Sequence, residues 1–381
     1  MFILELYWSF LRFSSYFGLF PCRLVCDLET GSKKLATIRG CNYLTRYLLY
    51  LSLLLGLSYF ILLSFDINDG KQSSIRGFTD TFSMYATMLV QILLPIIMAK
   101  HMWSLRRDLV NLQDHFQQYS PLVQCSAMRC KITIFFICYI ISQNLGAMGQ
   151  VISMLQNNHA QSLTIKILSL VAFAIQNGLL SWPLVIFQLI FYNLITQIGE
   201  WINKLRQSSD RHSMEDYLAL LGGVTRTKNM LSGCFFTFTF LTLLLIIFSA
   251  YFTISIFITM SHASTYSTMS MALGNSLQIF AYIFIVYHLN MTSQFIKDQF
   301  EDLAKSLNDK IGKESLETIS INGLSVPRQT AKYVVKELRS FQGFDGLGFF
   351  TLGKSLLTSI LANFATFFII LLQFKISEIQ S

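Results

Sequence analysis

Charged residues are scarce in this 381-residue sequence. Asp, Glu, Lys and Arg make up 13% of it, about half of the roughly 25% found in soluble globular proteins. The chain also has only 5 prolines, and its 34 Phe and 16 Tyr exclude a disordered or low-complexity protein. Hydrophobic residues reach 53% and the mean hydropathy is +0.49, so the composition indicates a polytopic membrane protein.

Seven apolar runs with almost no charge are each about long enough to cross the ~30 Å hydrocarbon core of a bilayer as a helix. They predict an all-α fold with seven transmembrane helices. The predicted spans are Tyr47–Phe65, Thr81–Met98, Ile132–Met154, Ile167–Leu194, Leu231–Met260, Met271–Met291 and Thr351–Phe374. The apolar stretch at residues 1–22 is interrupted by Glu5 and Arg12, so we expect an interfacial amphipathic helix there and not a cleaved signal peptide.

Acidic residues are absent from all seven runs. Proton- and sodium-coupled transporters usually need an ionisable group in the membrane, so this absence argues against such a carrier. No paired-carboxylate, serine-nucleophile or metal-ligand motif occurs either, and we expect no enzyme activity, cofactor or metal. The stretch Gly348–Ser355 does match the phosphate-loop pattern by letter, but a true phosphate loop follows a buried strand, and here an amphipathic helix precedes it.

Basic residues are distributed unevenly around the spans. Of the 29 Lys and Arg, 24 lie before span one or in the connections 99–131, 195–230 and 292–350, and only four lie on the other side. The positive-inside rule therefore places the N-terminus in the cytosol and the C-terminus outside, and it explains the net charge of +8 without a nucleic-acid partner. No cysteine falls in a predicted outer loop, which agrees with this orientation.

Apolar residues recur at helical spacing beyond span six, from Ile296 to Ile311 and again from Ala331 to Phe341. With a third helix over Trp103–Gln118, they predict a cytosolic helical bundle; the alternative is that they lie on the inner leaflet of the membrane. The expected organisation is a cytosolic segment 1–46, six spans over 47–291, anchor helices over 292–350, the last span over 351–374 and an outer tail 375–381.

Polar side chains within the spans need a partner helix or an aqueous cavity. The amides concerned are Gln91, Asn144, Gln150, Gln176, Asn177, Gln188, Gln278, Asn363 and Gln373. In the last span, small and polar residues recur at spacings near 3.5 from Ser355 to Gln373, opposite an apolar face. Such a stripe is either a close helix contact or a pore lining.

The end of the last span, Thr366 to Phe374, reads TFFIILLQF and resembles the insect gustatory-receptor signature of Thr-Tyr, five hydrophobic residues and Gln-Phe. Phe367 stands at the Tyr position and lacks its hydroxyl. Tyr16 to Arg23 is similar to the family's N-terminal Phe-Gly-Leu-x-Pro-x-Arg stretch, and the predicted topology covers the whole chain.

This resemblance implies a ligand-gated cation channel of four subunits, homomeric or formed with other gustatory receptor subunits, in the plasma membrane. The seventh helix would line the pore, with Gln373 and Phe374 at the outer gate and Ile370, Thr366 and Asn363 along the wall. The ligand pocket would lie in the outer half of the bundle among spans two to six. Aromatic and amide candidates there are Tyr85, Gln150, Gln176, Tyr251, Gln278 and Tyr282.

The expected ligand is a small-molecule tastant, with a bitter compound favoured and sugars, carbon dioxide and internal nutrients left open. Membrane lipid is the other expected partner. Two alternatives remain: a G-protein-coupled receptor, which needs an external N-terminus, and a membrane transporter, which needs substrate flux.

Overall fold

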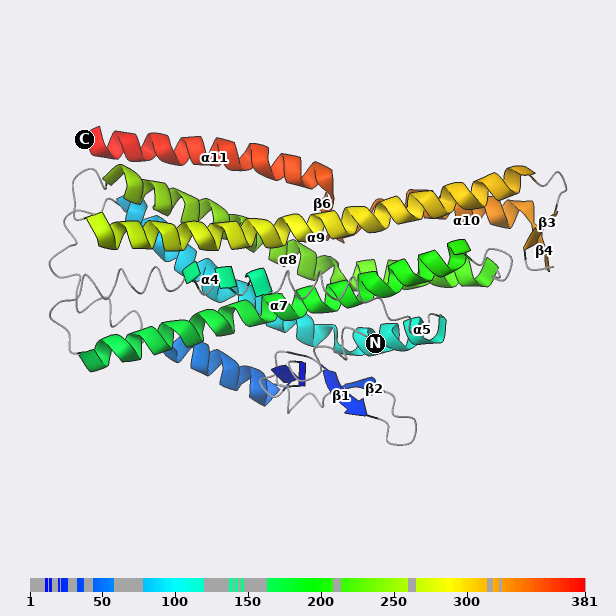
Figure 1. Ribbon diagram of the computed structural model, residues 1–381, viewed down its shortest axis with the longest axis horizontal. Coiled ribbons are helices and arrows are strands. Elements are labelled where there is room, and N and C mark those ends of the chain that lie inside the picture. Colours follow the sequence, from blue (N-terminus) through cyan, green and yellow to red (C-terminus); the bar gives the residue numbers. More distant parts are fainter. Residues whose placement is uncertain are drawn as a thin grey trace.

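The computed structural model describes residues 11–12, 14–15, 20, 22–26, 33–37, 44–57, 78–119, 137–139, 141–142, 145–146, 163–207, 214–259, 265–313, 318–321 and 324–380. Within them, five long helices lie side by side along one axis (Figure 1). They are α4 (Phe78–Ser104), α7 (Leu163–Gln207), α8 (Met214–Thr259), α9 (Thr265–Lys313) and α11 (Lys354–Gln380). The protein is thus an all-α, multi-helix membrane protein, as predicted.

The five long helices correspond to predicted spans two, four, five, six and seven, and all five are long and apolar enough to cross a membrane. The first predicted span is described only as far as residue 57, by a helix at Leu44–Leu57. Most of the third predicted span lies outside the described residues, and so does nearly all of the helix expected over residues 1–22.

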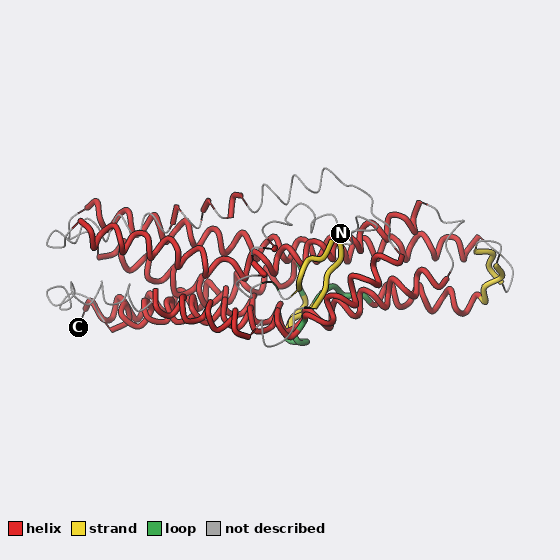
Figure 2. Tube along the Cα trace, turned by 90° about the horizontal axis from the view of Figure 1, so that it is seen from below, coloured by secondary structure: helices red, strands yellow, loops and turns green. Residues whose placement is uncertain are grey.

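Two shorter helices and three small antiparallel hairpins accompany the long helices (Figure 2). The helices are α5 (Arg106–Tyr119) and α10 (Arg328–Ser340). The hairpins pair β1 (Cys22–Cys26) with β2 (Lys33–Thr37), β3 (Thr318–Ile321) with β4 (Leu324–Pro327), and β5 (Asp345–Gly346) with β6 (Phe350–Thr351). Their registers pair Cys22 with Thr37, Thr318 with Pro327 and Asp345 with Thr351.

Helices α7, α8 and α9 are longer than a bilayer requires. They contain 45, 46 and 49 residues, which at 1.5 Å per residue gives about 70 Å, more than twice a ~30 Å hydrocarbon core. Their ends therefore extend past the membrane, and α10 packs against the far part of α9. The apolar faces predicted at Ile296–Ile311 of α9 and at Ala331–Leu338 of α10 are buried there.

Proline opens a hydrogen-bonding site inside α7. Pro183 has no N–H, so the carbonyl of Leu179 four residues earlier loses its helical partner. The hydroxyl of Tyr50, which is fully buried, donates to that carbonyl at 2.9 Å. The contact joins the helix Leu44–Leu57 to α7 and satisfies the carbonyl that the proline left free.

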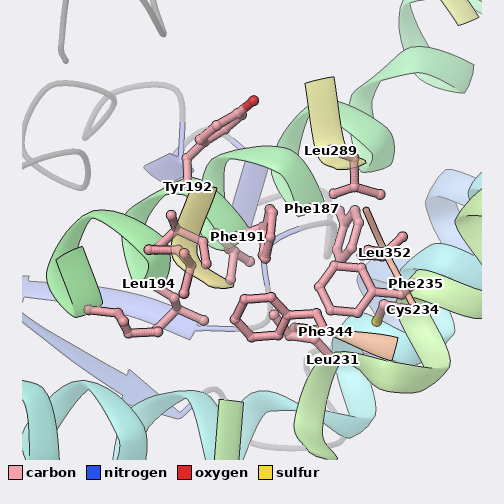
Figure 3. Packing of buried hydrophobic residues seen from close by; sticks show 14 of the residues in the cluster. Phe187, Phe191, Tyr192, Leu194, Leu231, Cys234, Phe235, Leu289, Phe344 and Leu352 are labelled. Atoms are coloured by element: carbon pink, nitrogen blue, oxygen red, sulfur yellow. The ribbon is translucent and has the colours of Figure 1, made fainter. Parts of the chain in front are cut away.

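Aromatic side chains fill the centre of the bundle where α7, α8 and α9 meet the β5–β6 hairpin (Figure 3). The ring of Phe191 lies 5.0 Å from that of Phe235 on α8 and 5.4 Å from that of Phe344, which precedes β5. Both contacts are edge-to-face, a favourable arrangement of aromatic rings. This core fixes the segment that leads into α11 against the rest of the bundle.

Candidate functional site: an intrabundle recess and the last helix

A small recess lies between α4, α7, α8 and α9. Polar and apolar side chains share its wall. The lining residues are Gln91, Leu94, Pro95, Asn177, Leu180, Ser181, Leu184, Leu245 and Tyr282. None of them carries a charge, so the recess suits a neutral molecule, because an unpaired charge is costly to bury.

Proline contributes to the polarity of this wall. Pro95 interrupts the hydrogen-bond ladder of α4, so the backbone carbonyl of Gln91 has no N–H partner from the next turn. Gln91, which lines the recess, therefore carries a backbone carbonyl that lacks its usual partner in the helix. Across the recess, the Ser181 hydroxyl donates to the carbonyl of Asn177 at 2.8 Å, which leaves the hydroxyl oxygen as an acceptor.

Of the pocket candidates chosen from the sequence, Tyr282 lines the recess. Tyr251 and Gln278 are buried in α8 and α9 but do not line it, and Gln176 is half-buried beside Asn177 on α7. Tyr85 is 55% exposed on α4. Gln150 lies outside the described residues.

Sequence reasoning did not choose Gln91, Asn177 and Ser181 as pocket residues. Gln91 and Asn177 belong to the set of intramembrane amides, and Ser181 lies one turn after Asn177, so the signal was present. The sequence does not tell how each helix is rotated about its axis, and this rotation decides whether an amide faces a neighbouring helix, the recess or lipid.

The predicted pore stripe lies on the free side of α11. Asn363, Thr366, Ile370, Gln373 and Phe374 are all exposed, and Phe374 is 60% exposed. The opposite, apolar face contacts the hydrophobic core of the bundle through Leu356, Leu357, Ile360 and Phe364. In Figure 1, α11 runs along the edge of the bundle, so one chain leaves the polar stripe uncovered.

Two side chains of α9 hold the segment that enters α11. The Asn290 side chain is fully buried, and its Oδ1 accepts from the N–H of Gly353 at 2.9 Å. Ser293 is also fully buried; its hydroxyl donates to the carbonyl of Leu352 at 3.0 Å and accepts from the N–H of Phe344 at 3.3 Å. We call Asn290 and Ser293, with these three backbone contacts, the α11 attachment.

An ion pair adds to the attachment from α8. Lys228 Nζ lies 2.7 Å from Asp345 Oδ2 at the start of β5. Gly353 is packed tightly here, because a Cβ at this position would approach Gln294 Oε1 to 2.9 Å. The start of α11 is therefore tied to both α8 and α9, whereas the residues from 354 to 377, apart from Lys375, are exposed or half-buried.

The phosphate-loop pattern at Gly348–Ser355 does not form a phosphate site. Three backbone N–H groups in the region are already bonded within the protein: Gly348 to Asp345 Oδ1 at 3.2 Å, Leu352 to the carbonyl of Phe344 at 2.7 Å, and Gly353 to Asn290. A phosphate loop needs such groups free to hold an anion. The negatively charged carboxylate of Asp345 would also repel a phosphate group.

A polar cluster lies at the meeting of α7 and α9. The Tyr192 hydroxyl lies 3.1 Å from His288 Nε2, and the Thr292 hydroxyl donates to the Tyr192 oxygen at 3.4 Å. Tyr192 is buried, and in Figure 3 its hydroxyl points away from the rings of Phe191 and Phe344. The α9 members of the cluster, His288 and Thr292, lie within one turn of Asn290 and Ser293, which hold the α11 attachment.

Comparison with known proteins gives one family and a set of similar folds. A model of the 7tm chemosensory receptor family matches residues 9–378. Among solved structures, the insect olfactory receptor OR5 from Machilis hrabei in complex with eugenol has a TM-score of 0.66 and 14% identity over 98% of this chain and 100% of that one. A second structure of the same receptor has a TM-score of 0.61 and 13% identity, with the same coverage. No curated protein sequence matches the chain.

Proposed function

The chain belongs to the seven-transmembrane chemosensory receptor family, and from this premise we propose that it is a gustatory receptor, a subunit of a tastant-gated, non-selective cation channel in chemosensory neurons. The family consists of receptors and not enzymes. The chain is accordingly a multi-pass membrane protein with a role in chemoreception.

The observation that supports a channel is the uncovered polar stripe of α11. The stripe lies on a helix that is otherwise apolar and turned with its apolar face to the bundle. Exposure of Gln373 and Asn363 to lipid would leave their amides without partners, which is costly. Several copies arranged with α11 at the centre would place these amides around a water-filled axis, with Gln373 and Phe374 as the gate and Ile370 and Thr366 below them.

We place four copies around this axis, either of this chain alone or with other gustatory receptor subunits. Helix α5 and residues 292–350, which contain the extended end of α9 and all of α10, would be the cytosolic anchor that holds the subunits together. The N-terminus would lie in the cytosol and the C-terminus outside the plasma membrane. The distribution of Lys and Arg supports this orientation.

The recess supports a small neutral ligand. OR5 from Machilis hrabei, whose fold is similar, has been solved in complex with eugenol. We propose that this chain binds a small-molecule tastant in the recess between α4, α7, α8 and α9. The signature at Thr366–Phe374 supports a gustatory receptor, and a bitter compound is the ligand that we favour.

Cysteine cross-linking tests the pore without any ligand. Gln373→Cys places a thiol on the stripe, and Leu357→Cys places one on the face of α11 that contacts the bundle. In membranes from cells that express the full chain, we expect oxidation to join Gln373→Cys subunits into dimers. Around a central axis the same residue of neighbouring copies lies close enough for a disulfide, which needs Cα atoms about 4.4–6.8 Å apart.

Leu357→Cys and the unmodified chain, which has its own seven cysteines, serve as controls and should remain monomeric on a non-reducing gel. Equal cross-linking of the two variants would contradict a central position of the stripe. Current recordings follow: Gln373→Ala should change permeation or gating of tastant-evoked currents in cells that lack G-protein signalling.

A further inference from the structure

One turn of α9 contacts both α7 and the entry to α11. His288 and Thr292 are four residues apart, so they share the face of this turn that meets Tyr192 of α7. Asn290 lies two residues after His288, on the other side of the helix, where its side chain accepts from the N–H of Gly353. The turn therefore contacts α7 with one face and holds the start of α11 with the other.

Hydrogen bonds account for every side-chain polar atom of the cluster that these residues form. The Thr292 hydroxyl has one hydrogen, and it lies closer to the carbonyl of His288, at 2.8 Å, than to the Tyr192 oxygen, at 3.4 Å. With the hydrogen on that carbonyl, the Thr292 oxygen accepts from His288 Nδ1 at 3.3 Å, which assigns the ring proton to Nδ1. Nε2 then accepts from the Tyr192 hydroxyl at 3.1 Å. The imidazole is thus held through both of its nitrogens.

A second contact joins the same point of α7 to the α11 attachment. Phe191, the neighbour of Tyr192, lies edge-to-face with Phe344 at 5.4 Å, and both rings belong to the aromatic core (Figure 3). The N–H of Phe344 is bonded to the Ser293 hydroxyl at 3.3 Å. Two neighbouring residues of α7 therefore reach the attachment, one through α9 and the other directly.

Helix α7 extends from these contacts to the middle of the bundle. Ser181 and Leu184 line the recess, and Tyr192 lies about 12 Å further along the axis, eight residues after Leu184. Pro183 interrupts the helix, but neither proline nor glycine occurs between Leu184 and Tyr192. This part of α7 is a regular helix, so a shift of its upper end displaces the cluster as well.

We propose that Tyr192 and His288 are positioning residues for the last helix. Their hydrogen bond fixes the turn of α9 that holds the entry to α11, so that the position of α11 follows that of α7. The two residues act through Asn290 and Ser293 and not by contact with ions or a ligand. This inference rests on the proposed function in so far as α11 lines a pore, and it names the contact through which the bundle regulates that helix.

Hydrogen exchange of the purified full chain in detergent tests this link without a ligand or a current. The backbone N–H groups of Phe344, Leu352 and Gly353 are bonded within the protein, so exchange over residues 344–353 reports how often the attachment opens. Tyr192→Phe removes only the hydroxyl, and we expect these groups to exchange roughly fivefold faster, the effect of about one buried hydrogen bond. Exchange in α10 should not change, whereas a general loss of stability would accelerate it there too.

Tyr50→Phe is the matched control. It removes another buried tyrosine hydroxyl, whose bond to the carbonyl of Leu179 at 2.9 Å also holds α7. That contact lies about 20 Å from Tyr192 along the helix. Exchange over residues 344–353 should therefore stay at the wild-type rate in Tyr50→Phe.

Variants of His288 separate the hydrogen bond from the packing of the ring. His288→Gln keeps a side-chain acceptor for the Tyr192 hydroxyl, so exchange over residues 344–353 should remain close to the wild-type rate. His288→Leu removes the acceptor and should accelerate exchange as much as Tyr192→Phe does. The two changes combined should exchange no faster than either alone, because the second removes a bond that is already lost. If Tyr192→Phe does not fold, the two His288 variants carry the test.

Three results would overturn the proposal. Unchanged exchange over residues 344–353 in Tyr192→Phe would mean that the attachment holds without the cluster. An equal increase in Tyr50→Phe would reduce the effect to a general loosening of α7, and equal increases in His288→Gln and His288→Leu would assign it to ring packing. None of these measurements involves the pore, and Gln373→Cys cross-linking involves none of these residues, so a failure here and a failure of the channel proposal are distinguishable.

Discussion

Helices α10 and α11 are neighbours in sequence and differ in how they cover their apolar residues. Helix α10 has 13 residues with one apolar stripe, Ala331, Val334, Val335 and Leu338, and all four side chains are buried by the chain itself. Helix α11 has 27 residues and is apolar on most of its surface, yet none of the residues in its most apolar stretch is buried. The first helix completes its packing within one chain, and the second needs lipid or other copies.

The difference shows that folding and assembly rest on separate parts of the molecule. Burial of α10 against α8 and α9 stabilises the fold of a single chain. Helix α11 contributes little to that core and is held mainly at its beginning, by Asn290, Ser293 and Lys228. Three predictions test this division, in order of decreasing effect.

Replacement of a leucine by alanine should destabilise the protein far more in α10 than in α11, and this is the largest of the three expected effects. Leu338→Ala removes a fully buried side chain from α10, and we expect it to destabilise the protein by about 2–5 kcal/mol because it leaves a cavity in the core. Leu361→Ala acts on a residue of α11 that is 68% exposed, and its effect on the fold should be below about 0.5 kcal/mol. Thermal unfolding of the detergent-solubilised chain measures both, and equal losses would mean that α11 is part of the core.

Loss of the α11 attachment should have an intermediate effect. Asn290→Leu leaves the N–H of Gly353 without its buried acceptor, and we expect a loss of about 1–3 kcal/mol in stability. Asn229→Leu, at an exposed position of α8, is the matched control and should change the melting temperature little. If Asn290→Leu is as stable as its control, the attachment does not hold α11, and another contact must be sought.

Removal of the ion pair should have the smallest effect. Lys228→Gln breaks the contact with Asp345, whose side chain is 19% exposed while that of Lys228 is 33% exposed. We expect a loss of at most about 1 kcal/mol, because partly exposed ion pairs are weak. The loss should shrink further as salt is raised, since salt screens such charges. Lys297→Gln, which breaks a contact of 4.0 Å to Glu301, should have no measurable effect; a larger effect there would contradict the ranking.

Local patterns in the sequence were sufficient to predict several parts of the fold. Long apolar runs predicted α4, α7, α8, α9 and α11, and the periodic apolar residues of α10 predicted the face that is buried. The same patterns could not predict the short hairpins, because pairings such as Asp345 with Thr351 are only two residues long. The signature at Thr366–Phe374 indicated the receptor family through its residues alone.

By itself, the sequence determined that the protein is helical, that it lies in a membrane, and that its last helix carries one polar stripe. Those properties follow from composition and from the 3.6-residue period of a helix. Only the tertiary structure decided what each amide side chain contacts. The rotation of α7 brings Asn177 to the recess and leaves Gln188 buried without a partner among the described residues, and the contacts of α9 place Asn290 at the N–H of Gly353. Such contacts join residues far apart in the chain, and they depend on how neighbouring helices pack, which no local pattern records.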